Sequence, residues 1–201
     1  DSYLALFKQK YVWLFFLGIF CYVSTEQGTS IFMSTFLEQY HGVNPQTDGA
    51  QAVSYFWGLM TTGCLVGMLL LKLIDSKRLL QISGVLTFVL LLSALFGSKG
   101  IALIAFPAVG FSISMMYSIV FSLALNSASQ HHGSFAGILC SAIVGGAGGP
   151  MIVSTIADAT SLRTGMLFIL VFVGYITFIG FWARPLINNK TVKLKKLLKK
   201  A

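Results

Sequence analysis

The stretch CYVSTEQGTSIFMSTFLEQY, residues 21–40, places polar side chains inside a long hydrophobic segment. Apolar or aromatic residues fill Tyr11–Phe20 except at Gly18, and apolar residues return at Ile31. Between these runs stand a carboxylate, an amide, a glycine and two hydroxyls: Glu26, Gln27, Gly28, Thr29 and Ser30. A membrane-spanning helix needs about 20 mostly apolar residues. The segment therefore has the length of a membrane span whose middle is polar.

The composition indicates that lipid is the solvent for most of the chain. Of the 201 residues, 56% are hydrophobic and only 10% are charged, whereas soluble domains carry roughly 25% charged residues. The apolar runs do not alternate as the strands of a membrane β-barrel do. We therefore expect an all-α membrane protein with six transmembrane helices, over Tyr11–Tyr40, Ala52–Ile74, Leu79–Phe96, Ile101–Leu125, Phe135–Ala157 and Met166–Ala183.

Around these spans we expect three parts: a juxtamembrane segment (1–10), a transmembrane domain (11–184) and a basic tail (185–201). The first span is not a secretory signal, because it is too long, lacks a small-residue cleavage pattern and holds Glu26 in its apolar core. Since the chain begins with Asp1 rather than Met, we expect a fragment, a processed product or an engineered chain.

The distribution of basic residues predicts the orientation of the helices. With a cytoplasmic N-terminus, the outer side receives only Lys99 and Arg163. The cytoplasmic side receives the other twelve of the 14 basic residues: Lys8, Lys10, Lys72, Lys77, Arg78, Arg184, Lys190, Lys193, Lys195, Lys196, Lys199 and Lys200. We therefore expect both termini in the cytoplasm. The net charge of +8 is an orientation signal, and no nucleic-acid partner is expected because no soluble face gathers the basic residues.

The tail sequence VKLKKLLKKA, residues 192–201, has two interpretations that the sequence does not separate. Its leucines share one helical face and its lysines cover the rest, which is typical of a helix lying on an anionic leaflet. A solvated tail that only reinforces the topology has the same composition.

The sequence predicts neither a metal site nor a cofactor. Cys21, Cys64 and Cys140 fall in different spans without paired spacing and are interpreted as packing residues. His131 and His132 are adjacent in an expected cytoplasmic loop and lack the spaced ligands that a metal requires.

The six spans have features of two inverted triplets. After the second span of each triplet, an Asp precedes a basic residue: Asp75, Lys77 and Arg78 in the first turn, and Asp158 through Arg163 in the other. Three helices per unit place these turns on opposite membrane faces. This arrangement is typical of a 3+3 inverted repeat, a common way to build half of a transporter.

The fifth span contains a cluster of small residues followed by proline: Gly145, Gly146, Gly148, Gly149 and Pro150. Small residues allow neighbouring helices to approach closely, and proline weakens the helix locally. We expect a tight packing face that also bends during gating.

The polar middle of the first span is the candidate substrate site. Glu26 lies about 22 Å along the helix from Tyr11, near the centre of a ~30 Å hydrocarbon core. An ionisable residue at that depth costs at least roughly 2.5 kcal/mol, so it usually faces a cavity or a partner. Tyr22 and Gln27 add a ring and an amide, and Gly28 would let the helix break there. Gly28 is assigned, with the glycines of the fifth span, to gating or helix packing. These groups suit a sugar, although a neutral or paired structural carboxyl remains the alternative.

The fourth span adds a second polar stripe in GFSISMMYSIVFSLALN, residues 110–126. Ser114 and Tyr117 fall on about one face, and Asn126 closes the span, so these three join the predicted substrate site. An intramembrane serine protease would need a histidine base near Ser112 or Ser114, and the expected spans contain none. The chain is therefore not expected to be an enzyme.

Four groups of residues, in order, resemble the fucose permease group of the major facilitator superfamily: Phe20-Cys21-Tyr22-Val23 with Glu26, then Tyr117 with Phe121-Ser122-Leu123, then Ile143-Val144-Gly145-Gly146 with Pro150, and Ala157-Asp158. The resemblance covers Tyr11–Ala183 and implies the C-terminal six of twelve helices. It further implies an inner-membrane sugar/proton symporter with two rocking halves. Glu26 and Tyr117 would face the sugar, and the proton-carrying acids would belong to an N-terminal half.

We therefore expect the C-terminal half of a secondary transporter that imports a fucose- or hexose-like monosaccharide by proton symport with alternating access, as the resemblance implies. Its partners would be the sugar, the proton, the bilayer and a six-helix N-terminal half on the same or another chain. The alternative is a non-transporting six-helix membrane subunit or scaffold that assembles with a partner chain.

Overall fold

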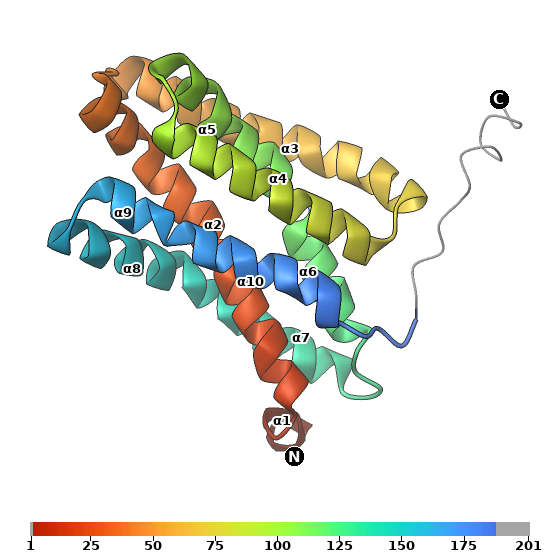
Figure 1. The fold of residues 1–201 in the computed structure, drawn as a ribbon. Coiled ribbons are helices and arrows are strands. Elements are labelled where there is room, and N and C mark those ends of the chain that lie inside the picture. Colours follow the sequence, from red (N-terminus) through yellow and green to blue (C-terminus); the bar gives the residue numbers. More distant parts are fainter. Residues whose placement is uncertain (1, 188–201) are drawn as a thin grey trace, which may run out of the picture.

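Every regular element in the described part of the chain is helical, and the helices run roughly side by side (Figure 1). The computed structural model describes residues 2–187. The predicted amphipathic tail helix lies outside them. The elements are α1 (Ser2–Phe7), α2 (Lys10–His41), η1 (Pro45–Gly49), α3 (Ala50–Leu73), α4 (Ser76–Phe96), α5 (Lys99–Ile113), α6 (Met116–Leu125), α7 (His132–Ser141), η2 (Ala142–Val144), α8 (Gly145–Ala159), α9 (Leu162–Leu167) and α10 (Ile169–Trp182).

These elements form the six expected spans. Five segments of the described chain are long and apolar enough to cross a membrane: Pro45–Leu73, Ser76–Phe96, Lys99–Leu125, His132–Ala159 and Leu162–Trp182. The sixth is α2, whose 32 residues extend over about 48 Å at 1.5 Å per residue. The six-helix prediction is confirmed, with span ends shifted by a few residues.

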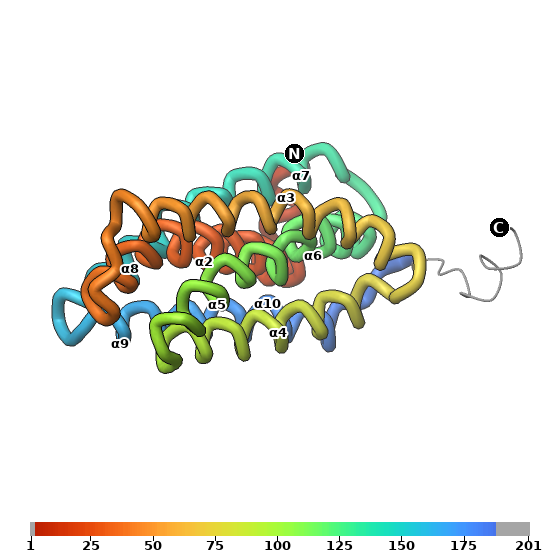
Figure 2. The backbone as a smooth tube through the Cα atoms, turned by 90° about the horizontal axis from the view of Figure 1, so that it is seen from above, coloured from red at the N-terminus to blue at the C-terminus, as the bar shows by residue number. Residues whose placement is uncertain are grey.

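The long helix α2 lies among the others and organises the bundle. It packs against α8, α10, α6 and α5, while α3 and α4 pack against α5. Seen from above, α4 and α10 lie together on one side and α7 on the other, with α2 and α6 between them (Figure 2). The element through the candidate site is therefore held by helices from both triplets.

The expected break at Gly28 is wrong, because α2 is one continuous helix from Lys10 to His41. Gly28 is buried, and a Cβ added to it would lie 3.3 Å from Ile169 Cδ1 of α10. Its missing side chain thus serves helix packing. The breaks occur in three other spans: α5 ends and α6 begins around Ser114 and Met115, the 3₁₀ turn η2 interrupts the fifth span before its glycines, and α9 ends and α10 begins around Phe168.

Close contact between α8 and α2 depends on two of the clustered glycines. A Cβ on Gly145 would collide with the backbone of Phe20, and a Cβ on Gly149 would collide with Ser24. Ser24 Oγ also donates a hydrogen bond of 3.1 Å to the carbonyl oxygen of Gly145. In lipid, where apolar burial gives little driving force between helices, such backbone proximity and hydrogen bonding hold the helices together.

The buried hydroxyl groups of α2 differ in whether they have a hydrogen-bond partner. Thr25 Oγ1 donates to the carbonyl oxygen of Cys21 at 2.8 Å, as hydroxyls in membrane helices commonly do. Thr29 is fully buried, yet its Oγ1 has no hydrogen-bond partner among the described residues. The polar run of α2 therefore includes one hydroxyl that contributes nothing through hydrogen bonding.

The turns expected to be equivalent between the triplets differ in structure. Asp75 caps α4, accepting a hydrogen bond of 3.1 Å from the backbone N–H of Lys77. Asp158, by contrast, lies inside the last turn of α8, and Ser161 caps α9 by accepting from the N–H of Thr164. The shared Asp-to-basic pattern thus has two different local roles.

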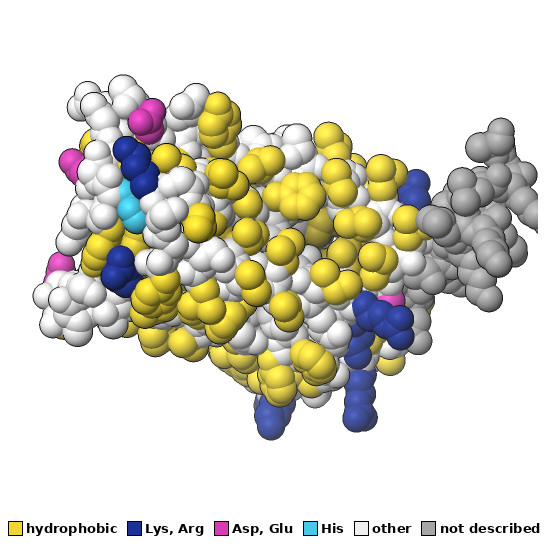
Figure 3. Space-filling view, turned by 45° about the horizontal axis from the view of Figure 1, so that its top comes forward, with side chains coloured by type: hydrophobic (Ala, Val, Ile, Leu, Met, Phe, Trp, Pro, Cys, Tyr) yellow, Lys and Arg dark blue, Asp and Glu magenta, His cyan; other side chains and the backbone are white. Residues whose placement is uncertain are grey.

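The surface has the polarity expected for a bilayer. Apolar side chains cover the middle of the molecule, and charged side chains gather toward its two ends (Figure 3). Alternation of the six spans places Lys99 and Arg163 at one end. The opposite end, called the basic end below, carries the other described basic residues: Lys8, Lys10, Lys72, Lys77, Arg78 and Arg184.

The glycine contact between α8 and α2 makes a prediction about stability. Gly145→Ala should lower the free energy of unfolding by about 1–3 kcal/mol, because the new methyl group meets the backbone of Phe20. Gly58→Ala is the matched control in α3: no atom lies within 4 Å of its added Cβ, so the variant should gain about 0.5–1 kcal/mol. Unfolding of both variants in detergent is the measurement. A Gly145→Ala chain as stable as the control would contradict the packing.

The unpartnered hydroxyl makes a second prediction. Thr29→Val keeps the shape of the side chain and removes a buried group without a partner, so stability should stay unchanged or rise by up to about 1 kcal/mol. Thr25→Val removes a hydrogen bond and should cost about 0.6 kcal/mol. Thermal unfolding of the two variants compares them directly. An equal loss in both would show that Thr29 has a partner of its own.

Candidate substrate-binding site

Glu26 and Gln27 are the two members of the polar run that remain partly exposed on α2. The Glu26 carboxylate is held by two neutral donors: Tyr22 Oη donates to Oε2 at 2.7 Å, and Gln27 Nε2 donates to Oε1 at 3.1 Å. Tyr22 reaches Glu26 because residues four apart share a helix face. The carboxylate is thus oriented by a phenol and an amide, and its remaining lone pairs are free to accept from a polar solute.

Three aromatic rings continue from this carboxylate onto α6. The rings of Tyr22 and Tyr117 have centroids 5.6 Å apart, and Tyr117 stacks on Phe121 with centroids 5.7 Å apart and 23° between the ring planes. Tyr22 is buried, whereas Tyr117 and Phe121 are half-buried. Phe121 was not among the predicted site residues. Its position four residues after Tyr117 is the signal that would have identified it.

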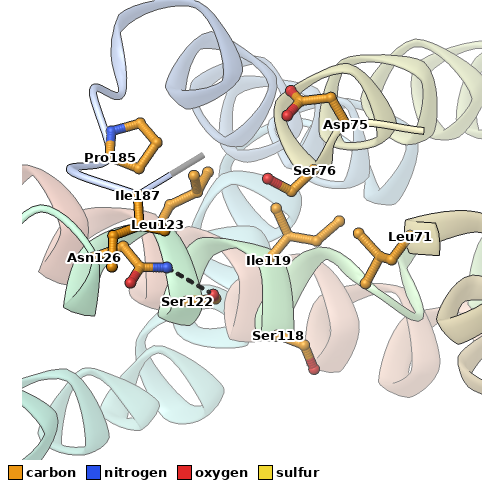
Figure 4. Close-up of a pocket in the computed structure, with 10 residues that line it drawn as sticks. All are labelled: Leu71, Asp75, Ser76, Ser118, Ile119, Ser122, Leu123, Asn126, Pro185 and Ile187. Atoms are coloured by element: carbon orange, nitrogen blue, oxygen red, sulfur yellow. Dashed lines mark hydrogen bonds between the residues drawn. The ribbon is translucent and has the colours of Figure 1, made fainter. Parts of the chain in front are cut away.

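One groove borders Tyr117 and Phe121, and a second lies farther along α6. One has a volume of about 410 Å³ and is lined by Tyr117, Ser118, Phe121, Ser122, Leu125 and Asn126. The second, of about 400 Å³, lies toward the basic end and shares Ser118, Ser122 and Asn126 with the first. Figure 4 shows this second cleft, with Asp75 and Ser76 of the α4 start and Pro185 across from α6. A chain of hydroxyls thus connects the ring cluster to the basic end.

Two predicted site residues lie away from the carboxylate. Ser114 sits at the α5–α6 break, where its Oγ donates to the carbonyl oxygen of Phe111 at 2.7 Å and its carbonyl accepts from Cys64 Sγ of α3 at 3.3 Å. Asn126 follows Tyr117 by nine residues, about 13 Å along a helix. Its amide donates to Ser122 Oγ at 3.4 Å, and its carbonyl accepts from the N–H of Leu186. Tyr22, Glu26, Gln27 and Tyr117 form the cluster without them.

The glycine-rich helix α8 borders the cluster. A Cβ on Gly146 would lie 3.6 Å from Gln27 Cγ, so α8 approaches the very residue that holds the Glu26 carboxylate. Four residues later, Pro150 removes the N–H that would bond to the Gly146 carbonyl. The packing residues and the polar cluster are therefore in direct contact, and a bend of α8 would move one wall of the cluster.

The cluster offers groups that can bind a polar solute. No histidine, cysteine or lysine touches the Glu26 carboxylate through a hydrogen bond that the structure records. Residues 2–187 also contain no group of three His, Cys, Asp or Glu side chains able to hold a metal ion. A carboxylate, an amide and stacked rings match the mixture of hydroxyls and C–H faces on a sugar ring.

Comparison with known proteins supplies relatives in sequence. No protein-family model matches the chain. It is 34% identical over 166 residues to a glucose/galactose transporter of Brucella abortus, and 30% identical over 165 residues to a putative glucose/galactose transporter of Helicobacter pylori. Each match covers 82% of the chain and 40% of the relative. The named relatives are transporters, in agreement with the expectation that the chain is not an enzyme.

Solved structures match the fold. The Escherichia coli fucose:proton symporter superposes with a TM-score of 0.84 at 18% identity, covering 91% of this chain and 45% of the symporter. A major facilitator superfamily transporter in the outward conformation, FucP, matches with a TM-score of 0.77 at 17% identity over 87% of this chain. The chain spans less than half the length of the proteins it matches. It is a multi-pass membrane protein that has the fold of a half of a major facilitator superfamily transporter and is similar in sequence to glucose/galactose transporters.

Proposed function

We propose that the chain is the C-terminal half of a secondary transporter that imports a hexose or a similar monosaccharide. The observation that carries the proposal is the Glu26 carboxylate, held by Tyr22 and Gln27 and placed one ring away from Tyr117. The relatives named as glucose/galactose transporters support a hexose as the substrate. The symporter of similar fold is named for fucose, a sugar with the same ring and one hydroxyl fewer.

Each group in the cluster has a role in this proposal. Sugar hydroxyls donate to the Glu26 carboxylate, and the Gln27 amide offers one more donor and one acceptor. Tyr117 and Phe121 present stacked faces to the C–H side of the sugar ring. Tyr22 keeps the carboxylate aimed by its 2.7 Å hydrogen bond. A pre-oriented site of this kind loses little entropy when the sugar binds.

Transport requires a second half in this proposal, on the same chain or another. The relatives are about 2.5 times as long as the matched region, and a partner half would cover the partly exposed Glu26, Gln27 and Tyr117. Alternating access would rock the two halves about this site. Proton coupling is proposed by analogy with the fucose:proton symporter, with the coupling acids in the other half.

The proposed location is the cell inner membrane, with both ends of the six-helix domain in the cytoplasm. The support is the charge distribution: six of the eight described basic residues lie at the basic end, which the positive-inside rule assigns to the cytoplasm.

Replacing the central carboxylate tests the proposal. In the complete carrier, Glu26→Gln should lower hexose uptake at least tenfold while the amount of protein in the membrane stays the same, because an amide replaces an acceptor for two sugar hydroxyls. Glu38→Gln is the matched control, since Glu38 is exposed near the end of the same helix. Uptake of radiolabelled glucose and galactose is the measurement.

The same variants separate transport from a scaffold role. Binding of the sugar should raise the unfolding temperature of the carrier, and Glu26→Gln should abolish that rise. Unchanged uptake in Glu26→Gln would remove Glu26 from the site. A carrier that neither takes up sugar nor changes its unfolding temperature, but still binds a partner chain, would establish the non-transporting subunit instead.

The aromatic pair gives an independent prediction. Tyr117→Phe keeps the stack with Phe121 and should change the KM for the sugar by less than about threefold. Tyr117→Ala removes a ring contact worth about 0.5–1.5 kcal/mol and should raise KM more than Tyr117→Phe does. Uptake rates measured over a range of sugar concentrations give both values. If Tyr117→Phe impairs uptake as much as Tyr117→Ala, the hydroxyl and not the ring face contacts the sugar.

A further inference from the structure

A groove separate from the Glu26 cluster runs between α4 and α10. Its volume is about 370 Å³, within the range of small-molecule sites. Gly84 and Gly174 form its floor, and Val85, Phe88, Phe178 and Phe181 form its walls. The four wall residues are exposed in the six-helix chain. Both helices lie within spans apolar enough to cross a membrane, so the groove opens toward lipid.

The groove offers hydrocarbon contacts and no free polar group. The hydroxyl of Thr177, one of the lining residues, donates to the carbonyl oxygen of Val173 at 2.8 Å within α10. The groove is also unfilled at Gly174, where a Cβ would find no atom within 4 Å. Its occupant must therefore be an apolar chain and not a sugar.

One end of the groove leads to an exposed arginine of α4. Gln81 Nε2 donates to the carbonyl oxygen of Gly180 at 2.9 Å, which joins the two helices just beyond the groove. Arg78 lies one turn from Gln81 and two turns from Val85, on the same face of α4 as the groove wall. Arg184, just after α10 ends, lines a different groove together with Lys10 and Ser127. Arg78 is exposed, and the structure records no hydrogen bond or ion pair of its side chain with residues 2–187.

We propose that this groove binds an anionic phospholipid, with one acyl chain against Gly84 and Gly174 and the phosphate beside Arg78. Arg78 lies at the basic end, which the proposed orientation assigns to the cytoplasmic leaflet. Basic pockets between membrane helices on that side bind anionic headgroups, and guanidinium groups pair well with phosphate. The apolar groove matches the acyl chain of a phospholipid, and the basic end matches its phosphate.

A second copy of the chain fits the groove less well. In a symmetric dimer the same patch of both subunits meets, so Arg78 of one copy would approach Arg78 of the other. An anionic lipid places a negative charge there instead. The open space above Gly174 also accepts a flexible acyl chain more readily than a facing helix.

The test measures lipid retention by native mass spectrometry of the purified, delipidated protein. Dioleoyl phosphatidylglycerol and dioleoyl phosphatidylcholine are titrated separately, since they share acyl chains and differ in net charge. We expect one tight phosphatidylglycerol molecule per chain and roughly fivefold weaker phosphatidylcholine binding. Arg78→Gln should weaken phosphatidylglycerol roughly fivefold, since each basic residue near the surface contributes about that factor. Lys72→Gln, an exposed charge at the end of α3, should change it less than twofold.

A second pair of variants tests the acyl-chain groove itself. Gly174→Leu fills the open space and should abolish the tight phosphatidylglycerol site, whereas Gly58→Leu, at another glycine without neighbours, should retain it. Equal retention of phosphatidylglycerol in both leucine variants would overturn the proposal, as would equal affinity for the two lipids. A chain dimer that Gly174→Leu dissociates would show that a second copy occupies the groove. None of these outcomes depends on sugar transport.

Discussion

The backbone contact between α8 and α2 is the constraint on which the candidate site depends. Because Gly145 and Gly149 lack side chains, α8 lies directly against Phe20 and Ser24. That placement brings Gly146 beside Gln27, and Gln27 in turn holds the Glu26 carboxylate. The position of the carboxylate thus follows from a helix contact one turn away. Lipid gives helices little hydrophobic reason to associate, so this contact has to come from close packing and hydrogen bonds.

In a lipid environment, the polar residues of α2 fall into two groups according to where they form hydrogen bonds. Ser24 and Thr25 donate to nearby carbonyls and satisfy themselves inside the helix bundle. Glu26 accepts from two side chains but stays partly exposed. Within one turn of α2, some polar residues therefore form hydrogen bonds inside the bundle, and another is left accessible to a solute. A hydroxyl can donate a hydrogen bond to a nearby backbone carbonyl oxygen. An ionised carboxylate can only accept hydrogen bonds, and the backbone N–H groups inside a helix are already used, so it depends on donors from other side chains or from a solute.

The sequence predicted the six spans well because hydropathy reports directly on the lipid solvent. It failed at Gly28, since a glycine beside polar residues looks the same whether it breaks a helix or lets Ile169 approach. Ser114 and Tyr117 were grouped by spacing on an unbroken helix. The break at Ser114 and Met115 turns Ser114 toward α3 instead. The ring contact between Tyr22 of α2 and Tyr117 of α6 joins residues far apart in the sequence, and local sequence patterns do not predict such a contact.

The exposure of Glu26 argues that this six-helix unit requires a cover. A charged side chain facing lipid at mid-membrane costs at least roughly 2.5 kcal/mol, and the partly exposed Gln27 and Tyr117 add polar groups to the same region. The surface of α4 and α10 has no such cost, because its groove is apolar and its charges lie at the end. The surface around Glu26 is therefore more stable against water or polar groups, as a second half would supply, whereas the surface of α4 and α10 is suited to lipid. The exposed polar groups of α2 and α6 therefore support the proposed second half on grounds separate from the length of the relatives.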